Sequence, residues 1–91
     1  MTRAIIRLVR IATINLLNDP WKRQERLKLF VAEVKRLKPD VILLQEVSLS
    51  ARVPEHLAKA LPEYHLSLCP RHGRLAGSEA EAVLSSQKTA R

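Results

Sequence analysis

The stretch Val41-Ile42-Leu43-Leu44-Gln45-Glu46 decides the fold, because four apolar residues are followed at once by an amide and a carboxylate. Pro39-Asp40 comes directly before this stretch, which is typical of a strand entered from a turn. An apolar run this continuous predicts a strand buried on both faces, as in parallel sheets covered by helices. Glu46 would then lie at the rim of the sheet. There a carboxylate either marks where the strand reaches water or binds a cation.

A strand and a helix are predicted before this stretch. Residues 4–14 are rich in β-branched side chains and predict a strand whose buried part is Ile11 to Ile14 and which ends at Asn15. Residues 20–37 predict a helix, with Asp19 as its cap and Pro20 in its first position. The buried stripe of this helix would consist of Leu27, Phe30, Val34 and Leu37, with Val31 beside it.

Strand, helix and second strand together predict a βαβ unit with parallel strands. Asn15 and Glu46 each end a strand, so both should lie at the carboxyl edge of one sheet, where α/β proteins commonly bind ligands. Two polar side chains at this edge can address one bound ion or phosphate.

The rest of the chain predicts a loop, a short helix and a β-hairpin, which gives an α/β fold. Residues 47–53 form the loop, and residues 54–61 have helical spacing up to Pro62. Residues 64–69 alternate as a strand, and residues 82–85 could pair back onto it after a basic loop over residues 70–78. Residues 1–86 would form one domain, and residues 87–91 a polar tail.

Composition narrows the function classes. The chain has 91 residues, enough for one small domain, and a net charge of +7 that lies in residues 1–38, where ten Lys/Arg face three acids. This basic half either attracts phosphates or forms a solvated helix face. Three aromatic residues are too few to form a surface on which the bases of single-stranded nucleic acid stack.

Cys69 is the only cysteine, and the sequence contains no signal-peptide core or membrane span, so we expect a cytoplasmic protein.

Four segments resemble the endonuclease/exonuclease/phosphatase superfamily. Residues 12–15, Ala-Thr-Ile-Asn, are similar to the family's strand ending T-W-N, with Ile14 in place of the aromatic residue. Residues 39–47 are similar to its P-D-V-(I/V)-x-L-Q-E strand, and Arg26 in the basic helix between the two strands belongs to the same resemblance. Tyr64 lies where the family's third strand often carries a tyrosine. Residues 77–86 resemble its G-x-E-G-x-A-(V/I)-L-S-R hairpin strand, with Ala80 and Ser86 as departures.

The resemblance implies metal-dependent phosphodiesterase or phosphatase chemistry on a four-layer α/β sandwich. Residues 1–86 would be the N-terminal part of that domain. Glu46 would ligate the catalytic Mg²⁺ (or Mn²⁺). Asn15 would bind or orient the same ion, or it would orient the scissile phosphate. The implied partner is a phosphate-ester substrate, with nucleic acid among the candidates.

The family's remaining catalytic motifs do not occur in the sequence. No G-D-x-N or S-D-H string is present, and none of the three histidines (His56, His65 and His72) follows an aspartate. We therefore expect little catalysis from these residues alone, and a sheet with one apolar face uncovered. Three hypotheses follow: a truncated hydrolase, a non-catalytic basic module that binds nucleic acid or another anion, and a subunit completed by a complementing chain.

Overall fold

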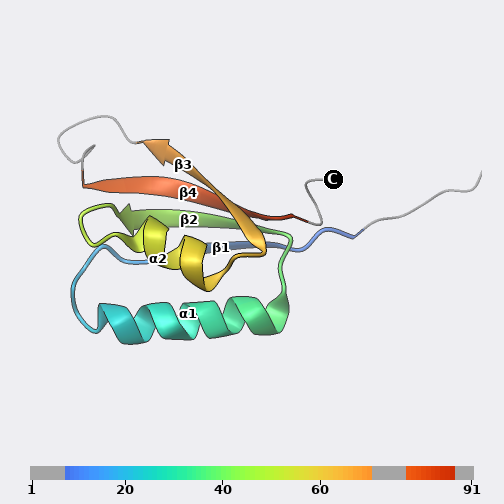
Figure 1. Ribbon diagram of the computed structural model, residues 1–91, viewed down its shortest axis with the longest axis horizontal. Coiled ribbons are helices and arrows are strands. Elements are labelled where there is room, and N and C mark those ends of the chain that lie inside the picture. The colour runs from blue at the N-terminus through green and yellow to red at the C-terminus, as the bar shows by residue number, and fades with distance from the viewer. Residues whose placement is uncertain (1–7, 71–77, 88–91) are drawn as a thin grey trace, which may run out of the picture.

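A four-stranded sheet with two helices forms the fold. The computed structural model describes residues 8–70 and 78–87 (Figure 1). Along the described chain the elements are β1 (Ile11–Asn15), α1 (Arg23–Leu37), β2 (Val41–Ser48), α2 (Val53–Ala60), β3 (Tyr64–Pro70) and β4 (Glu79–Ser86). This order confirms the predicted α/β class, with a βαβ unit followed by a short helix and a hairpin.

The strand order in the sheet is β1-β2-β4-β3. β1 and β2 are parallel neighbours, as predicted, with Ile11 opposite Val41 and Asn15 opposite Gln45. β4 pairs antiparallel with β3, which confirms the hairpin, and it also pairs antiparallel with β2. The last strand along the described chain is therefore an inner strand of the sheet, a position that the sequence analysis did not predict.

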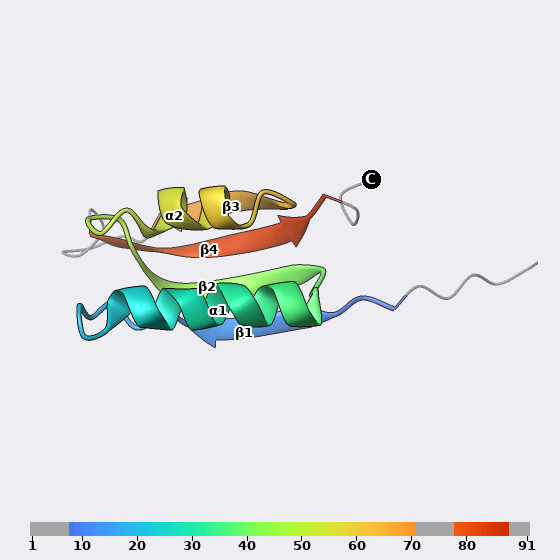
Figure 2. The ribbon, with the colours of Figure 1, turned by 60° about the horizontal axis from the view of Figure 1, so that its bottom comes forward.

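Both helices lie on one face of the sheet. α1 runs along β1 and β2, and α2 lies over the half of the sheet that contains β4 and β3 (Figure 2). The core between helices and sheet consists of Leu27, Phe30, Val34, Ile42, Leu44, Val47, Val53, Leu57, Leu61, Ala82 and Leu84.

The opposite face of the sheet is uncovered within the described residues. Side chains alternate along a strand, so Leu43 points away from the face that buries Ile42 and Leu44. Leu43 is 40% exposed and Ile11 is 67% exposed. The prediction that the 41–46 strand is buried on both faces is wrong, because the helices cover only one face. The uncovered face carries these apolar residues, as the family resemblance implied, but also Thr13 and Gln45, which are joined by a hydrogen bond of 3.1 Å.

The predicted ends of several elements differ from the structure. Strand β2 continues to Ser48, so the loop predicted from residue 47 begins only after the strand. β1 begins at Ile11, and α2 spans Val53–Ala60 where residues 54–61 were predicted. Gln87, the first residue of the predicted tail, donates its backbone N–H to the Glu63 carbonyl at 3.0 Å, so it is anchored to the domain.

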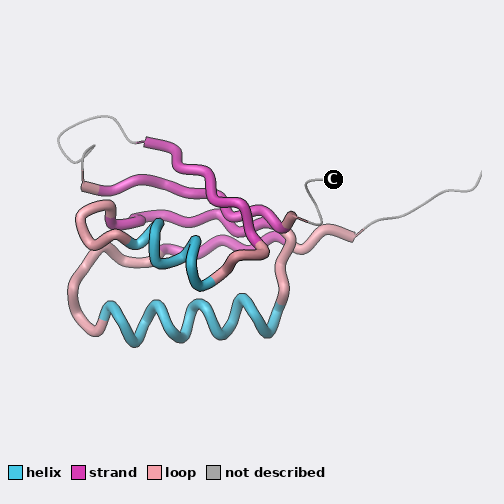
Figure 3. The backbone as a smooth tube through the Cα atoms, in the orientation of Figure 1, coloured by secondary structure: helices cyan, strands magenta, loops and turns pink. Residues whose placement is uncertain are grey.

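Helix α1 begins at Arg23 and not at Pro20. Asp19 does not cap the helix. Its Oδ1 atom accepts a hydrogen bond from the Trp21 N–H at 2.7 Å and so closes a turn before the helix. The late start leaves residues 16–22 as a loop at the same end of the sheet as the turn after β2 (Figure 3). At the other end of α1, Leu37 is 46% exposed and does not join the predicted stripe.

Some predictions fall on residues 1–7, 71–77 and 88–91, which lie outside the described residues. These are the start of the first strand, most of the basic loop with His72, Gly77 of the hairpin motif, and most of the tail. Neither α1 nor α2 has the length and apolar content to cross a membrane.

Candidate functional site

Asn15 and Glu46 meet at the carboxyl edge of the parallel pair, as the sequence analysis expected. Asn15 ends β1 opposite Gln45, next to Glu46 in sequence. The Asn15 Nδ2 atom donates a hydrogen bond to Glu46 Oε2 at 2.6 Å. Because the carboxylate is half-buried and the amide is exposed, the pair lies at the surface of the sheet end, accessible to a ligand.

A β-bulge aims the Glu46 side chain at this edge. Leu44 pairs with Ala82 and Val47 pairs with Ala80, so β2 carries one more residue than β4 between these pairs. Glu46 has φ 55°, in the left-handed region that a β-strand residue rarely adopts. Regular alternation from Ile42 and Leu44 would send residue 46 into the core. With the extra residue, Val47 enters the core and the carboxylate is directed to the rim.

The loop after β1 holds both polar side chains. The Leu17 N–H donates to Asn15 Oδ1 at 2.8 Å, which identifies that atom as the oxygen and leaves Nδ2 facing Glu46. The Asn18 N–H donates to Glu46 Oε1 at 3.2 Å. Each carboxylate oxygen of Glu46 therefore has a hydrogen-bond donor from the β1 end or from its loop.

Asn18 also connects the site to a second carboxylate. Its Nδ2 atom donates to Glu79 Oε1 at 3.1 Å, and its Oδ1 atom accepts from Arg23 Nη2 at 3.1 Å. Glu79 is 6% exposed, and Ser48 is the other buried polar residue in the described part of the chain. Neither Asn18 nor Glu79 was among the site residues predicted from the sequence. Asn18 directly precedes Asp19 and Pro20, which were interpreted only as a helix start, and Glu79 lies in residues 77–86, which resemble the family's hairpin strand.

The residues available to a cation at this edge are few. Within residues 8–70 and 78–87, no cluster of three or more His, Cys, Asp or Glu side chains is placed to hold a metal. His56 lies on α2 and His65 on β3, both exposed, and neither belongs to the Asn15–Glu46 site. The group that could bind a cation at this edge is thus the Glu46 carboxylate, beside an Asn15 amide whose NH₂ group faces it. A single carboxylate suits Mg²⁺, which keeps several waters and needs only one or two protein carboxylates.

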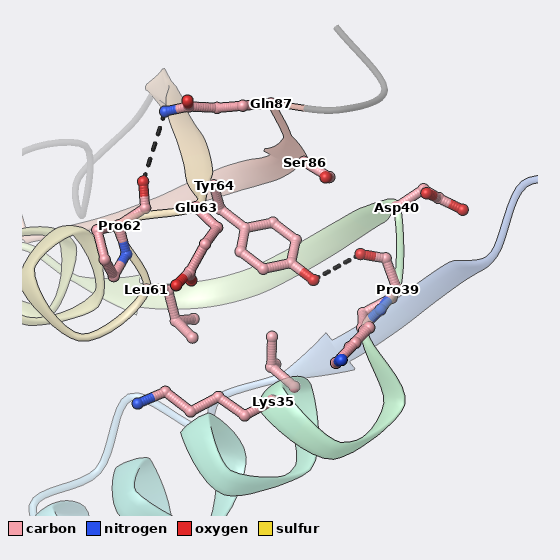
Figure 4. Close-up of a pocket in the computed structure, with 11 residues that line it drawn as sticks. Lys35, Pro39, Asp40, Leu61, Pro62, Glu63, Tyr64, Ser86 and Gln87 are labelled. Atoms are coloured by element: carbon pink, nitrogen blue, oxygen red, sulfur yellow. Dashed lines mark hydrogen bonds between the residues drawn. The ribbon is translucent and has the colours of Figure 1, made fainter.

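Tyr64 lies at the other end of the sheet, in a pocket between the ends of α1 and α2 (Figure 4). Its hydroxyl donates to the Pro39 carbonyl at 2.6 Å, just before β2 begins. Burial raises the pKa of the Tyr64 hydroxyl, and the nearby carboxylates of Asp40 and Glu63 raise it further. This tyrosine therefore secures the entry to β2 and takes no part in the Asn15–Glu46 edge.

Comparison with solved structures shows a similar fold. A crystal structure described as humanized D. rerio TDP2 by 14 mutations matches 88% of this chain with a TM-score of 0.74 and 17% sequence identity. The match covers 30% of that chain, so the present chain spans less than a third of it. No family model matches the sequence, and no curated protein matches it. At this identity the likeness shows the fold.

Proposed function

We propose that the Asn15–Glu46 edge is the cation-binding part of a Mg²⁺- or Mn²⁺-dependent phosphoester hydrolase of the endonuclease/exonuclease/phosphatase superfamily. The observation that carries this proposal is the 2.6 Å contact of Asn15 Nδ2 with Glu46 Oε2, at the carboxyl edge of two parallel strands. Two further points support it: the residues 12–15 and 39–47 that resemble the family motifs, and the fold likeness to TDP2, a protein of that fold.

In this proposal the two side chains have different roles. Glu46 supplies the anionic oxygen that a hard divalent cation prefers. Asn15 keeps its oxygen on the Leu17 N–H, so its NH₂ group faces the ligand and acts as a neutral donor to a phosphate or to the Glu46 carboxylate. This orientation favours an orienting role for Asn15 over direct coordination. The bound ion would stabilise negative charge that develops on the phosphoryl oxygens.

The groups that activate a nucleophile would come from outside these 91 residues. The sequence holds no G-D-x-N or S-D-H string. A carboxylate and an amide without a general base give little acceleration. We propose that the parent activity is hydrolysis of phosphodiester or phosphomonoester bonds. The missing groups would be supplied by a longer version of the chain or by a complementing chain.

Titration with MnCl₂ tests the cation site directly. Glu46→Gln keeps the shape of the side chain and removes its charge, so we expect Mn²⁺ affinity to fall by more than about tenfold. Glu55→Gln is the matched control, because Glu55 is a surface carboxylate paired with Arg52 at 3.1 Å on α2. Equal Mn²⁺ affinity in Glu46→Gln and the wild type would contradict the proposal.

The excess positive charge of residues 1–38 supports a second candidate function. In this alternative the chain is a non-catalytic module that binds nucleic acid or another polyanion. Lys22, Lys28 and Lys38 are exposed in or next to α1. Other cations are engaged within the fold, however, because Arg10 donates to the Leu37 carbonyl and Arg23 to Asn18. Affinity for a labelled oligonucleotide, measured at increasing salt concentrations, tests this candidate. A module of this kind loses affinity steeply as the salt concentration rises. No binding at low salt would remove the candidate.

A further inference from the structure

The loop between β1 and α1 makes the contacts that orient the candidate site. Leu17 donates to Asn15, and Asn18 donates to Glu46 and to Glu79. Leu17 has φ 58°, a left-handed conformation that is sterically unfavourable for leucine. A loop with such a residue keeps its shape only when surrounding contacts determine it.

One side chain, Arg26 of α1, supplies those contacts. Its Nη1 atom donates to the Leu16 carbonyl at 2.6 Å and to the Leu17 carbonyl at 3.1 Å. Its Nε atom donates to the Trp21 carbonyl at 2.9 Å, and its Nη2 atom donates to the Asp19 carbonyl. The guanidinium is partly buried and binds carbonyls on both sides of Asn18. Only an arginine has the planar fork of donors that this arrangement uses.

We propose that Arg26 is a positioning residue of the Glu46 site, acting through the loop and the Asn18 N–H. This inference rests on the proposed cation-binding function of Glu46. Arg26 donates hydrogen bonds to the carbonyls of residues 16, 17, 19 and 21. These bonds fix the backbone around Asn18 and so the direction of its N–H, which donates to Glu46 Oε1. Its substitution should therefore weaken cation binding without removing any group that touches the cation.

Arg26→Lys in the full chain tests the proposal, because lysine keeps the charge and loses the fork. We expect Mn²⁺ affinity to fall about tenfold, in the range found when residues supporting a metal ligand are removed. Arg36→Lys is the matched control, since Arg36 lies on the same helix and its guanidinium pairs at the surface with Glu33 at 2.7 Å.

Amide hydrogen exchange supplies a readout that a purely structural role would not give. In Arg26→Lys without metal, exchange at Asn18 should rise about tenfold, whereas exchange at Leu84 in the fully buried part of β4 should not change. Equal acceleration at both amides, or loss of the fold, would overturn the proposal, because Arg26 would then support the whole domain. In Arg26→Ala, added methylguanidinium should restore Mn²⁺ affinity.

Glu46→Gln separates this inference from the function on which it rests. If Glu46→Gln loses Mn²⁺ affinity and Arg26→Lys keeps it, the positioning role is overturned and the cation site stands. If Glu46→Gln binds Mn²⁺ as the wild type does, the cation site is overturned and the role of Arg26 with it.

Discussion

Two residues of the candidate site have backbone conformations that their side chains disfavour. Leu17 and Glu46 both have positive φ, and neither is a glycine or an asparagine. Strained residues of this kind gather at functional sites, where the surrounding contacts hold them. Here the contacts are known: Leu17 is held by Asn15 and Arg26, and Glu46 by Asn15 and Asn18.

The conformation of Glu46 predicts an unusual order of stability among its variants. Glu46→Gly and Glu46→Ala both remove the carboxylate, but only glycine accepts φ 55° without steric cost. Glu46→Gly should therefore be more stable than Glu46→Ala by about 1 kcal/mol, the reverse of the order in an ordinary strand. Urea denaturation of the two variants measures the difference. Greater stability of the alanine variant would show that the residue at the bulge is not in the left-handed conformation.

The hydroxyl of Tyr64 should contribute stability that depends on pH. Tyr64→Phe removes the hydrogen bond to the Pro39 carbonyl and should cost about 1 kcal/mol at neutral pH. The raised pKa of Tyr64 means that folding favours the protonated hydroxyl. Its contribution is therefore complete below the ordinary value of 10.0 and is lost as pH rises through the higher folded pKa. The free energies of unfolding of the wild type and of Tyr64→Phe, measured by denaturation, should converge as the pH rises above 10.0. A difference in the free energy of unfolding between the two proteins that does not change with pH would contradict this account.

At the scale of single elements, regular patterns were predictable and their ends were not. The periodic apolar residues of α1 and the apolar run of β2 identified both elements correctly. The predicted start of α1 was wrong, because the carbonyls before Arg23 accept hydrogen bonds from Arg26. No local pattern in the sequence indicates this contact. The end of β2 was wrong because a bulge lets the strand continue past Glu46.

The C-terminal end of α1 gives a matched pair of variants. Lys38 caps the helix at φ 49°, and its N–H donates to the Val34 carbonyl at 2.8 Å. Glycine suits this cap, so Lys38→Gly should raise stability by about 1 kcal/mol. Lys35→Gly removes the same charge from the last helical turn and should lower stability by about 1 kcal/mol. Thermal unfolding compares them, and destabilisation by both would contradict the assignment of the cap.

At the scale of the whole molecule, the sheet is covered on one face only within the described residues. The family resemblance led us to expect this, because the sequence is short and lacks later motifs. It did not lead us to expect β4 between β2 and β3, since the sequence indicated only that the hairpin strands pair with each other. The proximity of Asn15 and Glu46 was predictable from parallel strands. The contacts of Asn18 with Glu46 and Glu79 were not, because they join residues far apart in the sequence.

The uncovered face should promote self-association of the chain. Leu43 is 40% exposed on this face, and Leu29 is 68% exposed on α1, outside the sheet. Leu43→Gln should reduce the fraction of larger species in sedimentation velocity, because it removes apolar surface from the exposed sheet. Leu29→Gln changes the same residue type on the helix and should have a smaller effect. An equal effect of both variants would assign the association to general hydrophobicity and not to the sheet face.

The inner position of β4 has a consequence for how the chain is made. Synthesis runs from the N-terminus, and residues 79–86 supply the strand that joins β2 to β3. Until those residues have been added, β1 and β2 can form a parallel pair, but β3 has no partner in the sheet. Between the synthesis of β3 and that of β4, the nascent chain therefore carries a strand that has no partner in the sheet. Substitutions in β4 that slow its pairing should act during this interval, when the exposed strands are open to chaperones and proteases.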